Sequence, residues 1–219
     1  MKCLKALLKR LKSFVFANQS QSSALGGRLG WKTMKPSPEG FIFWHLCNFT
    51  PRMDKTVIIR NFVDVFDGWQ NRMDSIDPKG TRIKYRATSD YHKAHIRIFF
   101  VDPFVRFQDI DCVSGGVRTI YIPEKMDGPG GVLAYVPRDQ HIIFFDSSEN
   151  WSDMRTPKDG GISLFEVADH ELGHIHDMDH SDEPGSIMNP YNDGTSKRFT
   201  RKNMMVFEEI YSPIKKQVW

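Results

Sequence analysis

Residues 170–188 read H-E-L-G-H-I-H-D-M-D-H-S-D-E-P-G-S-I-M, and the rest of the chain can be arranged around this stretch. In an α-helix, residues four positions apart lie one turn apart on the same face. His170 and His174 can therefore offer two imidazole nitrogens to one metal ion. Glu171 lies on the same turn, where its carboxylate can act on a metal-bound water without binding the metal itself. The H-E-x-x-H spacing is typical of a zinc-binding helix.

A third ligand is expected beyond the end of this helix. His180 stands ten residues after His170, and Met188 follows eight residues later. A third histidine and a downstream methionine turn complete a known zinc-site pattern. Three neutral histidines leave a fourth coordination position open for water, as a catalytic zinc site requires. The alternative is a surface helix that carries several solvated histidines.

Asp177 departs from this pattern. Glycine ordinarily stands at this position, where the helix must end and the chain must turn back toward the third ligand. A left-handed backbone at a residue with a side chain costs about 1–2 kcal/mol, and aspartate is among the residues that tolerate it best. We predict a strained turn at Asp177 that still delivers His180.

The bulk composition indicates one globular domain. The chain has 219 residues, of which 40% are hydrophobic and 26% are charged. This length suffices for one sizeable core. No run of about 18 apolar residues is present, so no transmembrane helix is expected.

The net charge of +3 conceals an uneven distribution. Residues 1–38 contain eight Lys or Arg and no acidic residue, which leaves 22 basic and 27 acidic side chains in residues 39–219. The larger part of the chain therefore carries a balance of −5. This mildly acidic character argues against nucleic acid as a partner.

The N-terminal region is basic and amphipathic. In residues 1–17, leucines recur at helical spacing while lysines take the other faces. Such a helix can lie on an anionic membrane surface or be a degenerate export or transit signal, and the segment can also be a frayed basic tail. Residues 18–40 are rich in Ser, Gly, Gln and Pro, which predicts a linker. We divide the chain into residues 1–30, the tail and linker, and residues 31–219, the folded domain.

The three cysteines are Cys3, Cys47 and Cys112. An odd, low number does not make a disulfide framework. A pair between Cys47 and Cys112 remains open, and so does the redox compartment.

Hydrophobic periodicity predicts the secondary structure. Strands are expected at residues 41–46, 83–86, 94–101, 132–136 and 141–145. Helices are expected at residues 54–70, along the H-E-x-x-H segment, and at residues 201–211. Ser163 and Glu166 match an S-x-x-E capping box, so the zinc-binding helix is expected to begin at Ser163. Residues 102–126 show no strong pattern and are expected to be irregular.

With these elements placed, the chain from about residue 31 to 211 resembles the catalytic domain of matrix metalloproteinases, the matrixin branch of the metzincins. L-F-E-V-A-D-H-E-L-G-H at 164–174 is similar to the active-site helix of that family, and D-H-S-D-E-P-G-S-I-M-N-P at 179–190 to its third ligand and Met-turn. M-D-G-P-G-G-V-L-A-Y at 126–135 resembles its calcium loop and edge strand, and F-F-D-S-S-E-N-W at 144–151 its next strand and acidic turn. The resemblance implies an α+β, metzincin/zincin-like fold, with a twisted five-stranded mixed sheet, three helices and a zinc cleft.

The resemblance also implies a zinc-dependent metalloendopeptidase that hydrolyses internal peptide bonds of proteins. Zinc held by His170, His174 and His180 would polarise the scissile carbonyl, and Glu171 would act as general base on a zinc-bound water. Met188 would form the apolar floor beneath the metal without binding it. Two other classes remain open: a catalytically silent zinc-binding module, and a membrane-targeted effector whose basic tail is the active part.

Substrate contacts follow from the same resemblance. In that family the substrate lies extended and pairs with the edge strand as an added β-strand. Here that strand holds Gly131, Leu133 and Ala134. Pro190 and Tyr191, after the Met-turn, would line the main specificity pocket.

Glu166 can play either of two parts. It lies four residues before His170 on the same helix face, at a position that helps to set the depth of the specificity pocket in the family. A carboxylate there would favour a basic or polar substrate side chain. Alternatively, Glu166 only closes the capping box with Ser163.

A calcium site is expected beside the edge strand. Asp127, Asp146 and Glu149 fall where the family places its side-chain calcium ligands, with loop carbonyls near Gly128 and Gly130 completing the oxygen set. The alternative is an ordinary Asp-Gly turn and a solvated acidic loop.

The family's second, structural zinc is expected to be absent. The residues that match its ligand positions cannot bind zinc. They are Ile120, Ile122, Tyr135 and Phe144.

Localisation is left open. The family works outside cells, whereas charges interrupt the apolar segment of residues 1–17 and no clear export signal is visible. A P-R-C-G-x-P-D cysteine switch and a C-terminal propeller domain are not found in the sequence. A monomer is expected.

Overall fold

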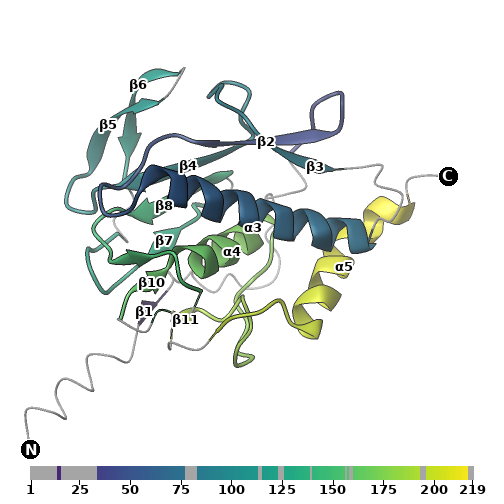
Figure 1. Ribbon diagram of the computed structural model, residues 1–219. Helices are drawn as coiled ribbons and strands as arrows, with labels where there is room; N and C mark the ends of the chain where they lie inside the picture. Colours follow the sequence, from purple (N-terminus) through teal and green to yellow (C-terminus); the bar gives the residue numbers. More distant parts are fainter. Residues whose placement is uncertain are drawn as a thin grey trace, which may run out of the picture.

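The computed structural model describes residues 14–15, 34–76, 83–112, 115–122, 126–138, 140–155, 157, 160–192 and 196–216. Within this part of the chain, one mixed sheet packs against three α-helices (Figure 1). Helices α3 and α4 lie on the same side of the sheet, and α5 lies at their end. This is the α+β metzincin fold that the sequence predicts.

Five strands form the central sheet, in the order β3-β2-β4-β8-β7. Their bounds are Phe41–Leu46 for β2, Lys84–Ala87 for β3, Ile96–Val101 for β4, Ala134–Tyr135 for β7 and Ile142–Asp146 for β8. Neighbouring strands are parallel except for β7, which pairs antiparallel with β8. The predicted five-stranded mixed sheet is confirmed, and the antiparallel strand β7 forms one of its edges.

Helix α3 (Lys55–Ile76) covers one face of this sheet. Asp54 caps its start, because one carboxylate oxygen accepts the backbone N–H of Thr56 at 2.8 Å. The helix continues past the predicted end at residue 70, since Met73 and Ile76 extend its buried stripe.

Aromatic rings fill the space between α3 and the sheet. Trp44 stacks on Phe66 with ring centroids 4.5 Å apart, and Phe62 packs edge-on against Phe145 at 5.5 Å. Trp69 is 0% exposed. Truncating a buried ring of this size to alanine typically costs about 3–5 kcal/mol of folding free energy. This aromatic layer therefore contributes much of the stability that holds the helices in place on the sheet.

Helices α4 (Leu164–Ile175) and α5 (Arg201–Lys216) join the same core. Arg72 of α3 and Asp169 of α4 form two hydrogen bonds, of 2.6 and 3.0 Å, and both side chains are largely buried. Phe207 of α5 packs edge-on against Trp69 at 5.5 Å. The three helices are therefore locked to one another beside the sheet.

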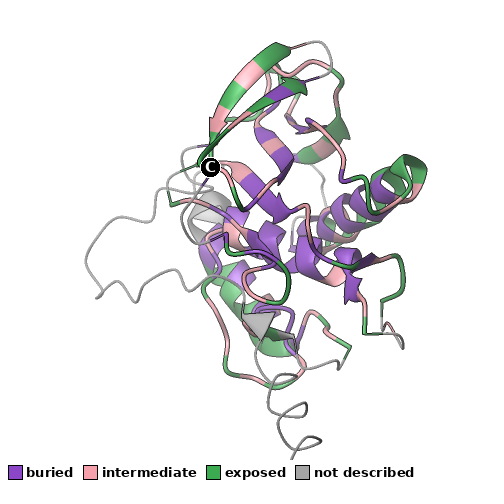
Figure 2. Ribbon diagram, turned by 90° about the vertical axis from the view of Figure 1, so that its left-hand side faces the viewer, coloured by how far each residue is buried: buried purple, intermediate pink, exposed green. Residues whose placement is uncertain are grey.

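The expectation of an irregular segment over residues 102–126 is wrong. Strands β5 (Phe107–Cys112) and β6 (Gly116–Tyr121) form an antiparallel hairpin there. Large apolar side chains at Phe107 and Tyr121 lie on its exposed face, so the alternation that announces a half-buried strand is lost. Figure 2 shows this hairpin as mostly exposed strands beside the buried interior.

A second, smaller apolar cluster lies on the opposite face of the sheet. Its buried members are Cys47, Phe99, Val101, Ile110, Cys112, Ile122, Met126 and Phe144. Both of these cysteines are free thiols, and burial raises the pKa of each.

Two short strand pairs flank the helices. Strand β1 (Phe14–Val15) runs antiparallel to β11 (Tyr191–Asn192), and β9 (Trp151–Ser152) runs parallel to β10 (Ile162–Ser163). The helix predicted for residues 1–17 is wrong at Phe14 and Val15, where the backbone is extended. Pairing with β11 satisfies backbone N–H and C=O groups that the end of an isolated helix leaves without partners. The remainder of the helix predicted for residues 1–17 lies outside the described residues. No helix within the described ranges is long and apolar enough to span a membrane.

Candidate metal centre

Three imidazoles converge at the end of helix α4. The Nε2 atom of His174 lies 3.0 Å from Nε2 of His170 and 3.1 Å from Nε2 of His180. Among the described residues, no other group of three or more His, Cys, Asp or Glu side chains brings its ligand atoms this close together. Zinc bound to nitrogen at about 2.0–2.1 Å in a tetrahedral site separates its ligands by about 3.3 Å. The observed spacing fits one zinc ion.

Backbone carbonyls fix the tautomers of the first two histidines. The Nδ1 atom of His170 lies 2.7 Å from the carbonyl oxygen of Ile187, and Nδ1 of His174 lies 2.8 Å from that of Met178. A carbonyl accepts only, so each Nδ1 must carry the proton and each Nε2 must present a lone pair. Lone pairs facing one another at 3.0 Å repel unless a cation lies between them. The arrangement is that of a cation-binding site.

The protonation states agree with this assignment. Burial, followed by repulsion from the neighbouring histidines, lowers the pKa of His170 well below its ordinary value. Burial likewise lowers the pKa of His174 to about 3 and the pKa of His180 by less. All three rings are therefore neutral at neutral pH, as metal ligands must be.

Glu171 lies beside this cluster and is 1% exposed. Its Oε1 atom has no hydrogen-bond partner among the described residues. Burial raises the pKa of its carboxyl to about 8. A buried carboxyl oxygen without a partner costs stability, so its presence here points to a role in binding or chemistry.

Met188, the predicted floor beneath the metal, packs against helix α4. It is 0% exposed, and its sulfur lies where a Cβ atom at Gly173 would be. Only glycine at position 173 leaves room for the Met-turn. The Ser181 N–H donates to the Met188 carbonyl at 2.8 Å, which holds the third-ligand segment to the turn.

The predicted turn at Asp177 is confirmed. Its φ is 62°, a left-handed conformation. The Asp177 N–H donates to the His174 carbonyl at 3.0 Å and the Met178 N–H donates to the Gly173 carbonyl at 3.0 Å. These two bonds define a Schellman motif with His176 as the C-cap residue. The turn redirects the chain so that His180 returns to the other two histidines.

Ser163 caps α4, but the predicted capping box is only half formed. The Ser163 hydroxyl accepts the Glu166 N–H at 3.2 Å. The Glu166 carboxylate instead accepts the backbone N–H of Lys197 at 3.0 Å. Burial raises its pKa, against the lowering effect of that bond. Glu166 therefore ties the helix to the segment that follows the Met-turn.

The residues predicted to contact substrate lie on two segments. Leu133 and Ala134 are buried at strand β7, and Gly131 precedes them and is half-buried. Pro190 is half-buried and Tyr191 is 52% exposed in β11. Within the described chain, β7 pairs with β8 on one side and with no strand on the other.

Three carboxylates gather around the loop before β7. Asp146 accepts the Gly128 N–H at 3.1 Å, Glu149 accepts the Gly130 N–H at 2.9 Å, and Asp127 accepts the Val132 N–H at 2.7 Å. Burial raises the pKa of Asp146, and it raises the pKa of Glu149 to about 7, with the neighbouring carboxylates adding to each. Their oxygens do not meet at one point as the imidazoles do. The mutual repulsion and the hard oxygen donors nevertheless fit a calcium ion.

The positions that match a second zinc site belong to the smaller apolar cluster. Ile122 and Phe144 are buried there, and Ile120 and Tyr135 pack against them.

No metal spacing in the sequence includes His176, and the sequence assigns it no role. It is 0% exposed and both of its ring nitrogens contact tyrosine hydroxyls. The partners are Tyr85 and Tyr211, which lie far away in the sequence, so no local pattern could reveal them.

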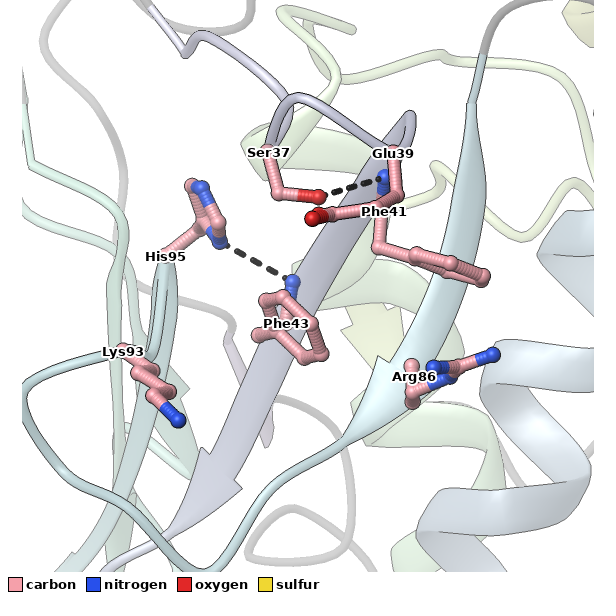
Figure 3. Close-up of a pocket in the computed structure, with 7 residues that line it drawn as sticks. All are labelled: Ser37, Glu39, Phe41, Phe43, Arg86, Lys93 and His95. Carbon is pink, nitrogen blue, oxygen red and sulfur yellow. Dashed lines mark hydrogen bonds between the residues drawn. The ribbon is translucent and has the colours of Figure 1, made fainter.

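A separate pocket of about 520 Å³ lies at the start of strands β2 and β3. Figure 3 shows Phe41 and Phe43 two residues apart along strand β2, with His95 beside them. His95 Nδ1 accepts the Phe43 N–H at 3.0 Å, and the Arg86 guanidinium lies 3.6 Å from the centre of the Phe41 ring. None of these residues belongs to the predicted metal or substrate sites.

The fold and the histidine cluster define a metzincin-type domain in which three histidines could hold one metal ion. The Matrixin family profile matches residues 37–212. This chain therefore belongs to the matrixin family. Membership supports, in general terms, a zinc metalloendopeptidase and implies zinc and calcium as its metals.

Individual relatives agree with the family profile. Matrix metalloproteinase-16 of Rattus norvegicus is 35% identical over 178 residues, which cover 78% of this chain and 26% of that protein. Macrophage metalloelastase of Oryctolagus cuniculus is 30% identical over 170 residues, which cover 73% and 30%. Matrix metalloproteinase-26 of Homo sapiens is 35% identical over 92 residues, which cover 39% and 34%. The matched region spans about a third or less of the length of these relatives.

Proposed function

We propose that this protein is a zinc-dependent endopeptidase that hydrolyses internal peptide bonds of protein substrates. One observation carries the proposal: three imidazole Nε2 atoms converge at helix α4, which also carries the buried Glu171, whose Oε1 atom has no hydrogen-bond partner among the described residues. A structural zinc site is closed by four protein ligands and needs no such acid. Three ligands and a carboxyl are a set that suits zinc-dependent peptide hydrolysis.

The metal would be held by His170, His174 and His180, and it would supply a Lewis acid for the scissile carbonyl and lower the pKa of water. Glu171 takes a proton from the attacking water and passes it to the leaving amine. Burial raises the pKa of this carboxyl to about 8, and a neighbouring positive charge lowers the pKa of an acid. The two effects oppose each other and keep the carboxyl able to exchange a proton near neutral pH.

The substrate would bind as an added strand on the open edge of β7. Leu133 and Ala134 place that edge beside the zinc-binding helix, since α4 and β7 are in contact. Pro190 and Tyr191 form the opposite wall. Glu166 supports that wall through its bond to the Lys197 N–H, so we propose that it shapes the specificity pocket as well as the helix terminus.

We also propose that Asp127, Asp146 and Glu149 bind calcium. The ion would neutralise three carboxylates that otherwise face one loop, and it would hold that loop against the start of β7. The Gly128 N–H donates to Asp146 and the Gly130 N–H donates to Glu149, so both carboxylates are held against this loop.

The test is hydrolysis of a quenched generic peptide by the full chain with zinc and calcium, beside Glu171→Gln. The variant keeps the shape of the side chain and removes its base. Loss of a general base typically lowers the rate by about 10²–10⁴-fold. We expect chelator-sensitive turnover in the wild type and a loss of that order in the variant.

Equal, negligible rates from two folded, zinc-loaded proteins would contradict the proposal. That outcome would favour the silent zinc-binding module instead. Activity that survives both the chelator and the substitution would point to a contaminating protease.

A further inference from the structure

His176 lies between two of the zinc-site histidines in the sequence, yet its ring points into the helix layer. The Nε2 atom lies 2.8 Å from the Tyr85 hydroxyl, and Nδ1 lies 2.6 Å from the Tyr211 hydroxyl. The ring also stacks on Trp69, with centroids 4.5 Å apart and planes 18° from parallel. Strand β3 and helices α3 and α5 therefore hold one imidazole from three directions.

These contacts form a connected polar chain. A neutral imidazole has one donor and one acceptor, so one tyrosine hydroxyl donates to His176 and the other accepts from it. Burial raises the pKa of Tyr211. The chain runs from Tyr85 through His176 to Tyr211 and so joins β3, the end of α4 and α5.

The backbone of His176 is equally constrained. Its N–H donates to the carbonyls of Leu172 and Gly173, at 3.1 and 3.0 Å, and so ends helix α4. The next two residues make the Schellman turn, and the Met178 carbonyl that follows accepts the His174 Nδ1–H. Any rotation of the His176 backbone would move both the carbonyl that orients His174 and the path to His180.

We infer that His176, held by the Tyr85 and Tyr211 hydroxyls, is the positioning residue that fixes the turn between the second and third zinc ligands. The inference rests on the proposed function, because the site it serves is the proposed zinc site. The zinc centre is in this way tied to β3 and to α5, neither of which supplies a ligand.

The test uses Tyr85→Phe and Tyr211→Phe, each of which removes one hydroxyl and keeps the ring. Tyr121→Phe is the matched control, since Tyr121 is 53% exposed on the hairpin strand β6. The full chain is loaded with zinc, and its release to a chromophoric chelator is timed at a temperature where every variant is folded by circular dichroism. Loss of a partner that orients a ligand typically weakens metal binding by about 10–100-fold. We expect faster release of about that size in the two network variants and none in the control.

Two further measurements separate positioning from plain stability. Cobalt in place of zinc reports ligand geometry through its visible absorption bands, which should shift in both network variants and not in Tyr121→Phe. The double variant should lose less than the product of the two single effects, because both hydroxyls act through one ring. His176→Gln keeps a donor and an acceptor, so it should release zinc more slowly than His176→Leu, even if either tyrosine variant folds poorly.

Wild-type release rates and unchanged cobalt bands in folded Tyr85→Phe and Tyr211→Phe would overturn the inference, even if both variants melt earlier. Equal release from the Gln and Leu variants at position 176 would do the same. If the wild type takes up no zinc, the proposed function fails together with the inference. If it binds zinc with the expected sensitivity but cleaves no peptide, only the proposed function fails.

Discussion

Asp177 carries a left-handed backbone at the residue where α4 gives way to the third-ligand segment. Aspartate has no steric advantage there, and glycine adopts the conformation without strain. The turn nevertheless forms, because two backbone hydrogen bonds and the anchored His176 ring determine its path.

Asp177→Gly should therefore stabilise the protein. The left-handed strain of about 1–2 kcal/mol is removed, while the added flexibility of glycine in the unfolded chain returns about 0.5–1 kcal/mol. We expect a net gain of about 0.5–1 kcal/mol, seen as a melting temperature higher by about 1–4 °C. Asp177→Ala is the control, since it also loses the carboxylate but keeps the strain. A melting temperature for the glycine variant at or below that of the alanine variant would refute this account.

Residue-level prediction was most informative where spacing is local. Helix spacing aligns His170 with His174, and the motif that follows the helix led us to expect His180 and the Asp177 turn; the structure brings the three imidazoles together and gives Asp177 its left-handed backbone. His176 lies in the same stretch, but its partners come from a strand and a helix that sequence spacing cannot align with it. The bond from Glu166 to the Lys197 N–H was missed for the same reason.

Among the elements, the loop that leads into β7 is the one whose stability should respond most to ions. Burial raises the pKa of Glu149 to about 7, above its value of 4.5 as a free side chain. A carboxyl whose folded pKa is raised contributes most below its unfolded pKa, and this contribution is lost as the pH rises through the folded pKa. Without calcium, the stability of the fold should therefore fall between about pH 4.5 and pH 7.

Calcium should reverse that loss. With zinc held constant at pH 7.5, calcium at 100 times its dissociation constant should raise the free energy of unfolding by about 2.7 kcal/mol. The gain should be seen as a higher temperature of thermal unfolding. The gain should be small at pH 5, where Glu149 is protonated. In Glu149→Gln the pH dependence should weaken and the response to calcium should shrink. A calcium response of equal size at both pH values would rule out this assignment.

Element boundaries were predictable where a cap or a continuous apolar run marks them. Strand β2 has the predicted bounds of residues 41–46, and α4 begins directly after Ser163, as the S-x-x-E pattern indicates. The β5–β6 hairpin escaped prediction because its outer face is both apolar and exposed.

At the scale of the whole molecule, the N-terminal part of the chain reaches the proposed substrate site. Strand β1 pairs with β11, and β11 begins at Tyr191, on the proposed wall of the specificity pocket. Backbone groups of β11 that bond to β1 are not available to a substrate.

Deleting residues 1–33 should accordingly lower the KM for a peptide substrate while leaving kcat and the zinc release rate unchanged. Initial rates over a range of peptide concentrations would measure both constants. An unchanged KM would mean that β11 is not part of the substrate site, and loss of all activity would mean that the fold or the site needs residues 1–33. Restoring the deleted segment as a separate peptide should inhibit the shortened protein competitively.

Strand β7 is two residues long, and this shortness has a consequence for solubility. A sheet edge with unpaired backbone groups is a template on which other chains can stack, and proteins protect such edges by keeping them brief. Two residues offer too few main-chain bonds to hold an arbitrary extended segment, so another copy of this protein gains little by lining up there. In the proposed function, a substrate chain would therefore need side chains that fit the flanking walls. The short edge would thus reduce aggregation and also make substrate binding selective.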